Sequence, residues 1–424
     1  MGRRASIGMV LAAVLLAGCT STTAGTAVKA GTSTGSDTAV VALMDTGPYP
    51  TSAGPPFPNA GAVSPTSGNT IEAQRMAEFV SGPWAVEAEI RDRGDVVLTS
   101  LTLPLPTIDL LKSASVLPDV LADVAAAHGY VAGFTTFRVS IPGASQKADL
   151  LNVVLRFQDP ESATAAAAEM AAANPPAVGA SPREPVTLPD LPDTRATLFT
   201  DNTGAEVVEA FTAHGAFVFC QRARSNRDPG AFTYGSKGLV QSAVISQARL
   251  IDKFVPTAID KLGDLPLDPT GKMLASTLIG PDNKSPAIIG AWPAAGWLHF
   301  ERDPLTAATL FRETGVDYVS QRLATVYRAR DTDAAQKVAD TLAVQARQEP
   351  SVRPVSPVAG LPAARCFERT LDGLPATSAM SWQRVKWHFR CIAAADRYAF
   401  STFSGTEADA KQQISAQYRI LAGR

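Results

Sequence analysis

The feature that most constrains the fold is an internal repeat, which begins near residue 130. Several segments of the first half recur in the second half in the same order, and three of the offsets fall near 171 residues. A constant offset across several elements indicates duplication. The corresponding segments are Gly133–Arg138 and Gly296–Glu301, Leu151–Ala173 and Arg322–Ala346, Arg195–Asp201 and Arg365–Asp372, Ala216–Cys220 and Trp387–Cys391, and Leu239–Phe254 and Ala410–Leu421.

Each repeat unit is predicted to run strand, strand, helix, strand, strand, helix. Asp159 followed by Pro160 is typical of a helix start, with aspartate as N-cap, and Thr406 with Asp409 resembles a capping box before the last helix. A helix after each strand pair needs one sheet face to cover. We therefore predict an α+β fold of two tandem ferredoxin-like α/β sandwich repeats with mostly antiparallel sheets.

The segment before the repeats is less regular. Residues 39–43 form a short apolar run that predicts a strand, residues 71–80 have helical spacing, and residues 108–127 predict two helices separated at Pro118. The predicted organisation is a signal peptide at 1–18, a flexible tether at 19–37, an N-terminal extension at 38–128, repeat 1 at 129–255, a connector at 256–290 and repeat 2 at 291–424.

The first nineteen residues indicate where the protein works. Arg3 and Arg4 precede an apolar run at 7–16 that is too short to span a membrane, and Leu16-Ala17-Gly18-Cys19 follows. Small residues before a cysteine suit a lipoprotein signal, in which the Cys19 thiol takes up a diacylglycerol. We predict a chain anchored by lipid at the extracytoplasmic face of the cell membrane; the alternative is an ordinary signal peptide with a chance cysteine.

The composition and net charge limit the kinds of partner that we expect for the chain. Apolar residues make up 46% of the chain and charged residues 18%, which is enough for two hydrophobic cores. The formal net charge is -2, and no dense basic cluster occurs, so nucleic acid is not an expected partner.

Three cysteines remain once Cys19 is lipidated, so at most one intramolecular disulfide can form. Cys366 and Cys391 lie on strands predicted to be neighbours, and a bond between them would close a loop worth roughly 3 to 4 kcal/mol. Cys220 is then a free thiol, most simply a buried and inert one.

Two sets of residues could carry binding. The segment 385–391 alternates as a strand would, which would place the basic residues Arg384, Lys386, His388 and Arg390 on one face, facing anionic head groups or simply solvent. Four tryptophans could line a cleft between the repeats or belong to the core, namely Trp292, Trp297, Trp382 and Trp387.

The sequence offers no catalytic motif to place on this fold. It contains no Gly-x-Ser-x-Gly elbow, no His-Glu-x-x-His helix, no Cys-x-x-Cys pair and no glycine-rich dinucleotide loop. Its four histidines lie far apart in the chain. We therefore predict no catalytic residue, no metal site and no cofactor, although a convergent triad cannot be located or dismissed from sequence.

Two strings in the first part of the chain carry a resemblance: Leu43-Met44-Asp45-Thr46-Gly47-Pro48-Tyr49-Pro50-Thr51 and Glu72-Ala73-Gln74-Arg75-Met76-Ala77. Together with the lipoprotein signal and the duplication, they make the chain similar to an uncharacterised family of cell-envelope lipoproteins from mycobacteria and related actinobacteria. The resemblance covers the mature chain. It implies location, lipidation and a duplicated α+β domain, and it carries no activity or catalytic residue.

The favoured hypothesis is a non-enzymatic binding protein that holds a lipid, glycan or protein partner in a groove between the repeats. One alternative is an envelope hydrolase or transferase, which a hydrogen-bonded Ser–His or Cys–His pair in a pocket would favour. The other is a structural or assembly subunit, which large exposed apolar patches and the lack of a pocket would favour.

Overall fold

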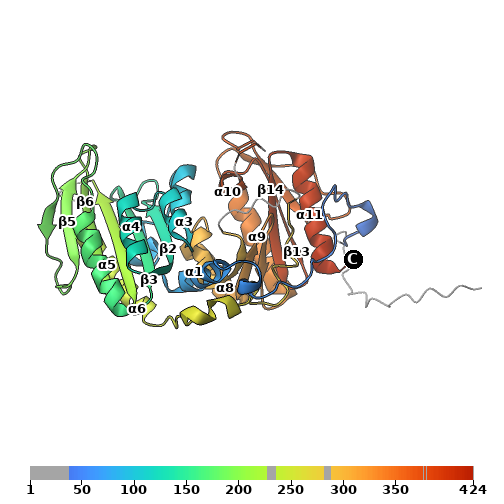
Figure 1. Ribbon diagram of the computed structural model, residues 1–424. Helices are drawn as coiled ribbons and strands as arrows, with labels where there is room; N and C mark the ends of the chain where they lie inside the picture. The colour runs from blue at the N-terminus through green and yellow to red at the C-terminus, as the bar shows by residue number, and fades with distance from the viewer. Residues whose placement is uncertain (1–37, 227–234, 281–287, 376, 379, 424) are drawn as a thin grey trace, which may run out of the picture. The chain divides into compact units, whose positions relative to one another are not determined.

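The computed structural model describes residues 38–226, 235–280, 288–375, 377–378 and 380–423. The predicted signal peptide, the predicted tether and Cys19 lie outside the described residues. The described chain contains two seven-stranded sheets, and every strand pairs with its neighbours in antiparallel fashion (Figure 1). We call the part built on the first sheet the first domain and the part built on the second sheet the second domain.

The first sheet has the order β1-β2-β3-β7-β6-β5-β4. Its strands are β1 (Leu103–Leu105), β2 (Tyr130–Val139), β3 (Ala148–Phe157), β4 (Glu184–Val186), β5 (Arg195–Thr200), β6 (Glu206–His214) and β7 (Phe217–Ser225). The second sheet has the order β8-β9-β10-β14-β13-β12-β11. Its strands are β8 (Gly290–Pro293), β9 (Tyr318–Gln321), β10 (Thr325–Arg328), β11 (Val352–Pro354), β12 (Arg365–Arg369), β13 (Phe389–Ala395) and β14 (Tyr398–Ser404).

The two sheets share one topology, because counting strands along the chain gives the same spatial order in both. This identity confirms the predicted duplication. The major helices also correspond: α5 (Pro160–Ala173) matches α9 (Thr332–Arg347) after the third strand, and α6 (Ser236–Ile251) matches α11 (Glu407–Ala422) after the seventh.

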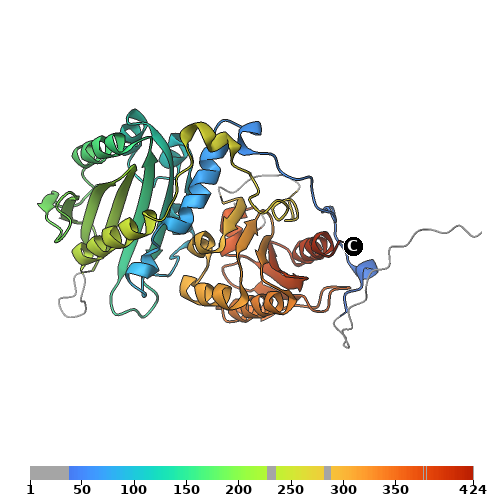
Figure 2. The same ribbon diagram turned by 90° about the horizontal axis from the view of Figure 1, so that it is seen from below.

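Helices lie on both faces of each sheet (Figure 1, Figure 2). In the first domain α5 packs on one face with apolar residues such as Phe157 and Val218, and α6 packs on the other with Phe219 and Ala223. In the second domain α9 and α11 divide the two faces in the same way. The predicted ferredoxin-like sandwich, with helices on one face alone, is therefore not what forms; strands such as β7 are apolar on both sides and need two covering layers.

The remaining helices are short and connect or seal these layers. They are η1 (Val41–Leu43), η2 (Ala60–Ala62), α1 (Ser67–Met76), η3 (Ala77–Phe79), α2 (Pro83–Val86), η4 (Val96–Leu101), α3 (Ile108–Ser113), α4 (Asp119–Ala127), η5 (Ile259–Asp264), α7 (Ala294–Trp297), η6 (Leu298–Phe300), α8 (Pro304–Thr314) and α10 (Met380–Val385). The helix predicted at 71–80 and the pair separated at Pro118 are present.

The equivalent helices α5 and α9 begin with equivalent caps, while α11 has a threonine cap that its counterpart α6, which begins after Gly235, lacks. The Asp159 carboxylate accepts the backbone N–H of Ser162 at 2.7 Å, and the Asp331 carboxylate accepts that of Ala334 at 2.8 Å. The Thr406 hydroxyl accepts the N–H of Asp409 at 3.4 Å. Each bond satisfies an N–H that the first helical turn leaves without a partner, so the N-caps predicted from sequence are confirmed.

Three predicted strands are wrong. Residues 39–43 contain the helix η1, which lies against the second domain through the Val40 N–H and the Gly360 carbonyl, 2.8 Å apart. Residues 296–301 form the α7–η6 turns, because helical spacing lets Trp297 and Phe300 pack into the same core. The strand predicted at 385–391 begins only at Phe389, after α10.

The predicted boundary of the first repeat also moves. The strand β1 and the helices α3 and α4 had been placed in an N-terminal extension that ended at residue 128. In the structure β1 pairs with β2, with Leu105 opposite Gly133, and α3 and α4 cover the α5 face of the same sheet. These elements therefore belong to the first domain, as the matching segment from β8 to α8 belongs to the second.

The predicted disulfide between Cys366 and Cys391 is present, and it joins the paired strands β12 and β13. Cys220 is free and buried. The sequence comparison aligned Cys220 with Cys391, and this alignment was wrong. Cys220 lies on β7, whose counterpart is β14, whereas Cys391 lies on β13, the counterpart of β6. Strand order and register instead place Cys391 where the first domain has Ala210 and Cys366 where it has Ala196, and those two alanines face each other in the same way.

One hydrophobic cluster extends through both domains. Phe134 on β2 makes edge contacts with Trp292 on β8 and with Phe300, at centroid distances of 6.3 and 6.2 Å. Phe217 and Phe219 belong to the same cluster, while Val218 and Cys220 on the other side of β7 lie beneath α4 and α5. The strand β7 is thus covered on both faces, and one cover is shared with the second domain.

Candidate functional site

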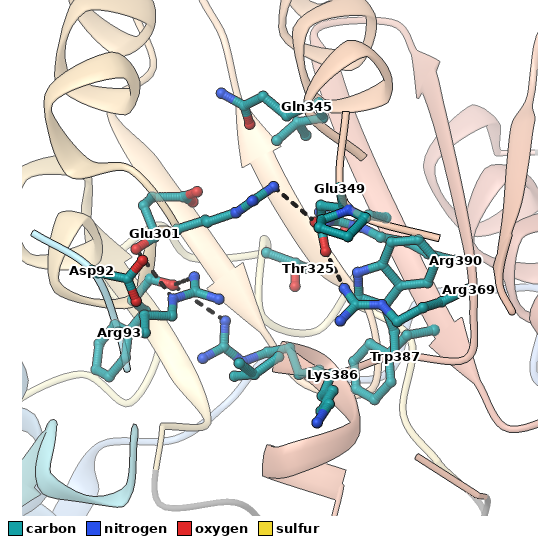
Figure 3. A pocket seen from close by; sticks show the side chains of 18 of the residues that line it. Asp92, Arg93, Glu301, Thr325, Gln345, Glu349, Arg369, Lys386, Trp387 and Arg390 are labelled. Atoms are coloured by element: carbon teal, nitrogen blue, oxygen red, sulfur yellow. Dashed lines mark hydrogen bonds and ion pairs between the residues drawn. The ribbon is translucent and has the colours of Figure 1, made fainter. Parts of the chain in front are cut away.

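A cavity lined by many charged side chains lies on the α9 face of the second sheet, and we call it the basic pocket (Figure 3). Its volume is about 290 Å³. The walls come from β10, β12, β13 and β14, from the end of α9, from α10 and from the turn at 92–95 in the first domain. Six basic side chains line it, namely Arg93, Arg302, Arg369, Arg384, Lys386 and Arg390, against the four acidic residues Asp92, Asp95, Glu301 and Glu349.

Glu349 neutralises one side of the basic pocket. Its carboxylate accepts a hydrogen bond from Arg369 and lies 3.4 Å from a guanidinium nitrogen of Arg302 (Figure 3). The Arg369 guanidinium in turn lies over the Trp387 ring, 4.8 Å from its centroid. This arrangement assigns two of the six cations to a structural ion pair and uses Trp387 as a buried platform.

Three arginines bind the carbonyl groups at the end of η6. Arg138 on β2 donates to the carbonyls of His299 at 2.6 Å and Glu301 at 2.9 Å, and Arg93 donates to those of Phe300 and Glu301. Arg384 from α10 reaches the Phe300 carbonyl at 3.4 Å. Carbonyls at a helix end lack internal partners, so these arginines satisfy them and, in the case of Arg93 and Arg138, join the two domains.

The turn that carries Arg93 is fixed locally. The Asp92 backbone bonds to Val139 on β2 in both directions, and its side chain accepts the N–H of Gly94 at 2.7 Å. Gly94 has a φ of +67°, a conformation that favours glycine. The first domain therefore presents Arg93 to the pocket from a rigid turn.

The electrostatics of the basic pocket are dominated by burial and mutual repulsion. Burial, followed by the nearby charge of Arg93, lowers the pKa of Arg384 to about 9. Burial also lowers the pKa of Arg93, while the carboxylates of Glu301 and Glu349 oppose that change. One oxygen of Glu301 accepts hydrogen bonds from the Trp297 indole at 2.7 Å and the Tyr327 hydroxyl at 2.8 Å. A bound anion would relieve this repulsion.

Lys386 and Arg390 differ from the other cations of the basic pocket. Among the described residues, neither side chain has an ion pair or a hydrogen bond to a carboxylate, and neither is fully exposed. The Arg384 Nε atom is also enclosed without a hydrogen-bond partner in this part of the structure. The site thus has donors that the fold itself does not use.

The four tryptophans proposed from sequence do not line one cleft. Trp292 and Trp297 are buried in the shared core, with centroids 6.3 Å apart. Trp382 is 37% exposed on α10 and does not line the basic pocket, whereas Trp387 does. For Trp292 and Trp297 the core alternative is the one that the structure supports.

The four basic residues proposed as one strand face lie on different elements. Arg384 ends α10, Lys386 follows it, and Arg390 lies on β13; all three reach the basic pocket. His388 does not line it, because its ring nitrogens are directed at the Gly405 carbonyl at 3.2 Å and the Glu368 carboxylate at 3.8 Å. Arg384, Lys386 and Arg390 are therefore brought together because α10 is inserted before β13, and not because they alternate along one strand.

Sequence reasoning missed Arg93, Glu301, Glu349 and Arg369 as pocket residues. They are far apart in the chain, and three of them lie in segments whose secondary structure was predicted wrongly or not at all. The available signal was the alternation of basic residues at 384–390. Nothing local to Arg93 indicates that it faces the second domain.

The Ser–His or Cys–His pair that would favour a hydrolase is not found in the described chain. Within the described ranges no serine or cysteine side chain is hydrogen-bonded to a histidine, and no group of three or more potential metal-ligating side chains occurs. His299 does bond to a hydroxyl, that of Thr136 at 3.0 Å, but both are buried. Burial raises the pKa of the Cys220 thiol, which disfavours a reactive thiolate.

The fold and the basic pocket define a duplicated two-domain α/β protein with a charged cavity. Two family models match: "Domain of unknown function (DUF7373) N-terminal" over residues 60–267 and "Domain of unknown function (DUF7373) C-terminal" over residues 273–424. The chain therefore belongs to the DUF7373 family. The two matches divide the chain close to where the two sheets divide it.

Among solved structures, the chain is similar to the extracellular domain of PknH from Mycobacterium tuberculosis. The similarity covers 31% of this chain and 70% of that chain at 15% identity, with a TM-score of 0.24. No curated protein matches the chain. In the ranges that the structure describes, no helix combines the length and apolar character needed to cross a bilayer.

Proposed function

We propose that this chain is a lipid-anchored envelope lipoprotein that binds a small ligand, without catalysis, in the basic pocket. The observation that carries the proposal is the pocket itself, a cavity of about 290 Å³ whose walls come from both domains and whose donors are partly unused. Ligand sites are concave and often lie between domains. A cavity of this size suits a small molecule or the head group of a lipid or glycan better than a protein surface.

The lipid anchor is supported by sequence alone. The Leu16-Ala17-Gly18-Cys19 string is the attachment signal, and the tether that follows is rich in threonine, serine, alanine and glycine. Cys19→Ser tests it: the wild-type chain from the native host partitions into the detergent phase of an extract, and the variant partitions into the aqueous phase. Equal partitioning of both chains would contradict lipid anchoring.

Binding is tested by native mass spectrometry of the mature chain purified from its own host. The wild-type chain retains a small molecule. Gln345→Trp, which fills the basic pocket from α9, loses it, while the matched control Gln348→Trp, on an exposed residue just past the same helix, keeps it. Retention of the same ligand by both variants, or by no chain at all, would contradict the proposed site.

The alternatives have less support. A hydrolase or transferase would be favoured by a Ser–His or Cys–His pair in the pocket, and the pocket lining contains no histidine and no cysteine. A purely structural subunit would be favoured by the lack of a pocket, and a pocket is present.

A further inference from the structure

The duplication provides an internal reference for the basic pocket. The hairpin of β13 and β14 closes at Ala395 opposite Tyr398, and that of β6 and β7 closes at His214 opposite Phe217. Arg390 precedes Ala395 by the same number of residues as Glu209 precedes His214. Arg390 pairs with Phe403, and Glu209 pairs with Arg222. Arg390 therefore occupies the position that Glu209 holds in the first domain.

The equivalent place in the first domain is nearly filled. A cavity of only about 50 Å³ remains there, lined by apolar residues of the segment 116–121, of β3 and of β6, by Cys220, and by Glu209 and Arg222. The Glu209 carboxylate is satisfied, because it accepts a hydrogen bond from Arg183 and another from Asn174 at 2.7 Å. The first domain thus closes this position around a paired carboxylate, with Arg222 as the only cation among the described residues that line the small cavity.

The second domain departs from this reference at several positions of the same face. Ser401 stands where the first domain has Cys220, and Thr325 stands where it has Val153, so hydroxyl groups replace a thiol and a methyl group. The connection between β12 and β13 is also extended by α10, which supplies Arg384 and is followed by Lys386. Ser401, Arg384 and Lys386 each add a hydrogen-bond donor to the basic pocket, whereas the Thr325 hydroxyl donates to the Gln321 side chain at 2.6 Å.

The charge of the lining indicates the kind of ligand. Six basic and four acidic side chains leave a formal surplus of two positive charges. Glu349 holds Arg302 and Arg369, whereas Arg390 and Lys386 have no carboxylate partner among the described residues. A dianion would balance the surplus, and guanidinium, ammonium and hydroxyl donors together suit tetrahedral phosphate oxygens.

We propose that the basic pocket binds the dianionic phosphate group of a phosphate monoester, with Arg390 and Lys386 as its principal contacts and Ser401 as a hydroxyl donor. This inference rests on the proposed function and specifies its ligand. The rest of the ligand lies against Phe300 and Phe403. The monoester is either a free small molecule or the head group of a lipid of the phosphatidic acid type.

The test is isothermal titration calorimetry of the full mature chain with glycerol 3-phosphate, with acetate and glycerol as comparison ligands. Glycerol 3-phosphate binds, and acetate and glycerol do not compete. Arg390→Gln weakens binding by at least about tenfold, since a charge-assisted contact is lost, and Arg390→Lys recovers part of the affinity. The matched control is Arg195→Gln, an exposed arginine of β5, and it leaves affinity unchanged.

A lipid source is distinguished by vesicle flotation with the Cys19→Ser chain, whose own anchor is removed. Vesicles of phosphatidylcholine with phosphatidic acid carry the chain upward only if the head group enters the pocket, and Arg390→Gln abolishes this, while vesicles of phosphatidylcholine alone carry none. Binding in either arm that depends on Arg390 supports the proposal. Lack of binding in both arms, or equal binding by wild type and Arg390→Gln, overturns it.

Failure of this inference differs from failure of the proposed function. If the native chain retains a ligand that is lost in Gln345→Trp but contains no phosphorus, the binding function stands and the phosphate assignment is overturned. If no ligand is retained and no phosphate binds, both are overturned. Circular dichroism of Arg390→Gln and Arg390→Lys establishes that a change in binding is not a loss of folding.

Discussion

The two domains share one strand order but fill it differently. In the first domain β2 and β3 are ten residues each, and both faces of the sheet are sealed by helices and apolar side chains. In the second domain the matching strands β9 and β10 are four residues each, and the α9 face opens into the basic pocket. The topology therefore does not by itself create the pocket.

The difference lies in a few positions of the same face. Glu209, Cys220 and Val153 in the first domain correspond to Arg390, Ser401 and Thr325 in the second. The first set closes the face with a paired carboxylate and apolar packing. In the second set Arg390 and Ser401 place donors at a cavity, while the Thr325 hydroxyl donates to Gln321. The first domain thus keeps closer packing on this face, while the second domain has a larger cavity lined by charged side chains.

The largest effect is expected from truncation in the sealed face. Leu155 is fully buried on β3, so Leu155→Ala removes packing from a region that cannot collapse and lowers the free energy of unfolding by about 2 to 5 kcal/mol. Ser401→Ala, on the hollow face of the second domain, costs less than about 1 kcal/mol because its side chain borders a cavity. Chemical denaturation measures both, and equal losses would contradict the contrast.

The disulfide gives a second way to compare the domains. Replacing Cys366 and Cys391 with alanine lowers the free energy of unfolding by about 3 kcal/mol, because the denatured chain regains the freedom of a closed loop. Ala196 and Ala210 face each other in the first domain as the cysteines do in the second. The double variant Ala196→Cys, Ala210→Cys should form the equivalent bond. Failure of that pair to oxidise would contradict the assigned register.

The junction of the domains should respond to pH through His299. Burial lowers the pKa of His299 to about 3, and its ring bonds to Thr136 and to the Ala77 carbonyl while neutral. The unfolded chain takes up a proton below a pH of about 6.5 and the folded chain does not, so stability falls by about 1.4 kcal/mol per pH unit as pH decreases from there toward 3. His299→Gln removes this contribution. Denaturation curves at several pH values would contradict it if wild type and variant had the same slope.

The smallest expected effect concerns the equivalent caps. Asp159→Ala and Asp331→Ala each remove the side-chain acceptor at the start of a matching helix, and each costs about 1 kcal/mol. Equal losses would show that the duplicated helices are held in the same way. A loss confined to one domain would show that the two helices are held differently, despite the shared strand order.

The sequence predicted those parts of the fold that depend on local chemistry. The helix starts at Asp159 and Thr406 and the break at Pro118 follow from capping and backbone rules, and they are confirmed. The disulfide followed from the neighbouring positions of its strands. The duplication was visible because these local signals recur at a nearly constant offset.

The sequence did not predict features that depend on distant packing. The alternation around Trp387 looks like a strand, yet the segment before it folds as α10, because Trp387 is buried under Arg369 and Arg384 reaches the Phe300 carbonyl. The strand predicted at 296–301 was wrong for the same reason, since the α7–η6 turns found there are fixed by contacts with Phe134 and Arg138. About a third of the residues that line the basic pocket lie in or beside these segments, at 300–302 and 384–387. Arg93 and Glu349 reach the pocket from other parts of the chain, so local patterns could not identify them.

The most direct test of this account is a crystal structure of the mature chain grown with glycerol 3-phosphate. The account predicts a phosphate group beside Arg390 and Lys386 in the second domain, and no ligand at the equivalent place beside Glu209 in the first. A phosphate bound elsewhere, or a basic pocket that stays empty at saturating ligand, would contradict it.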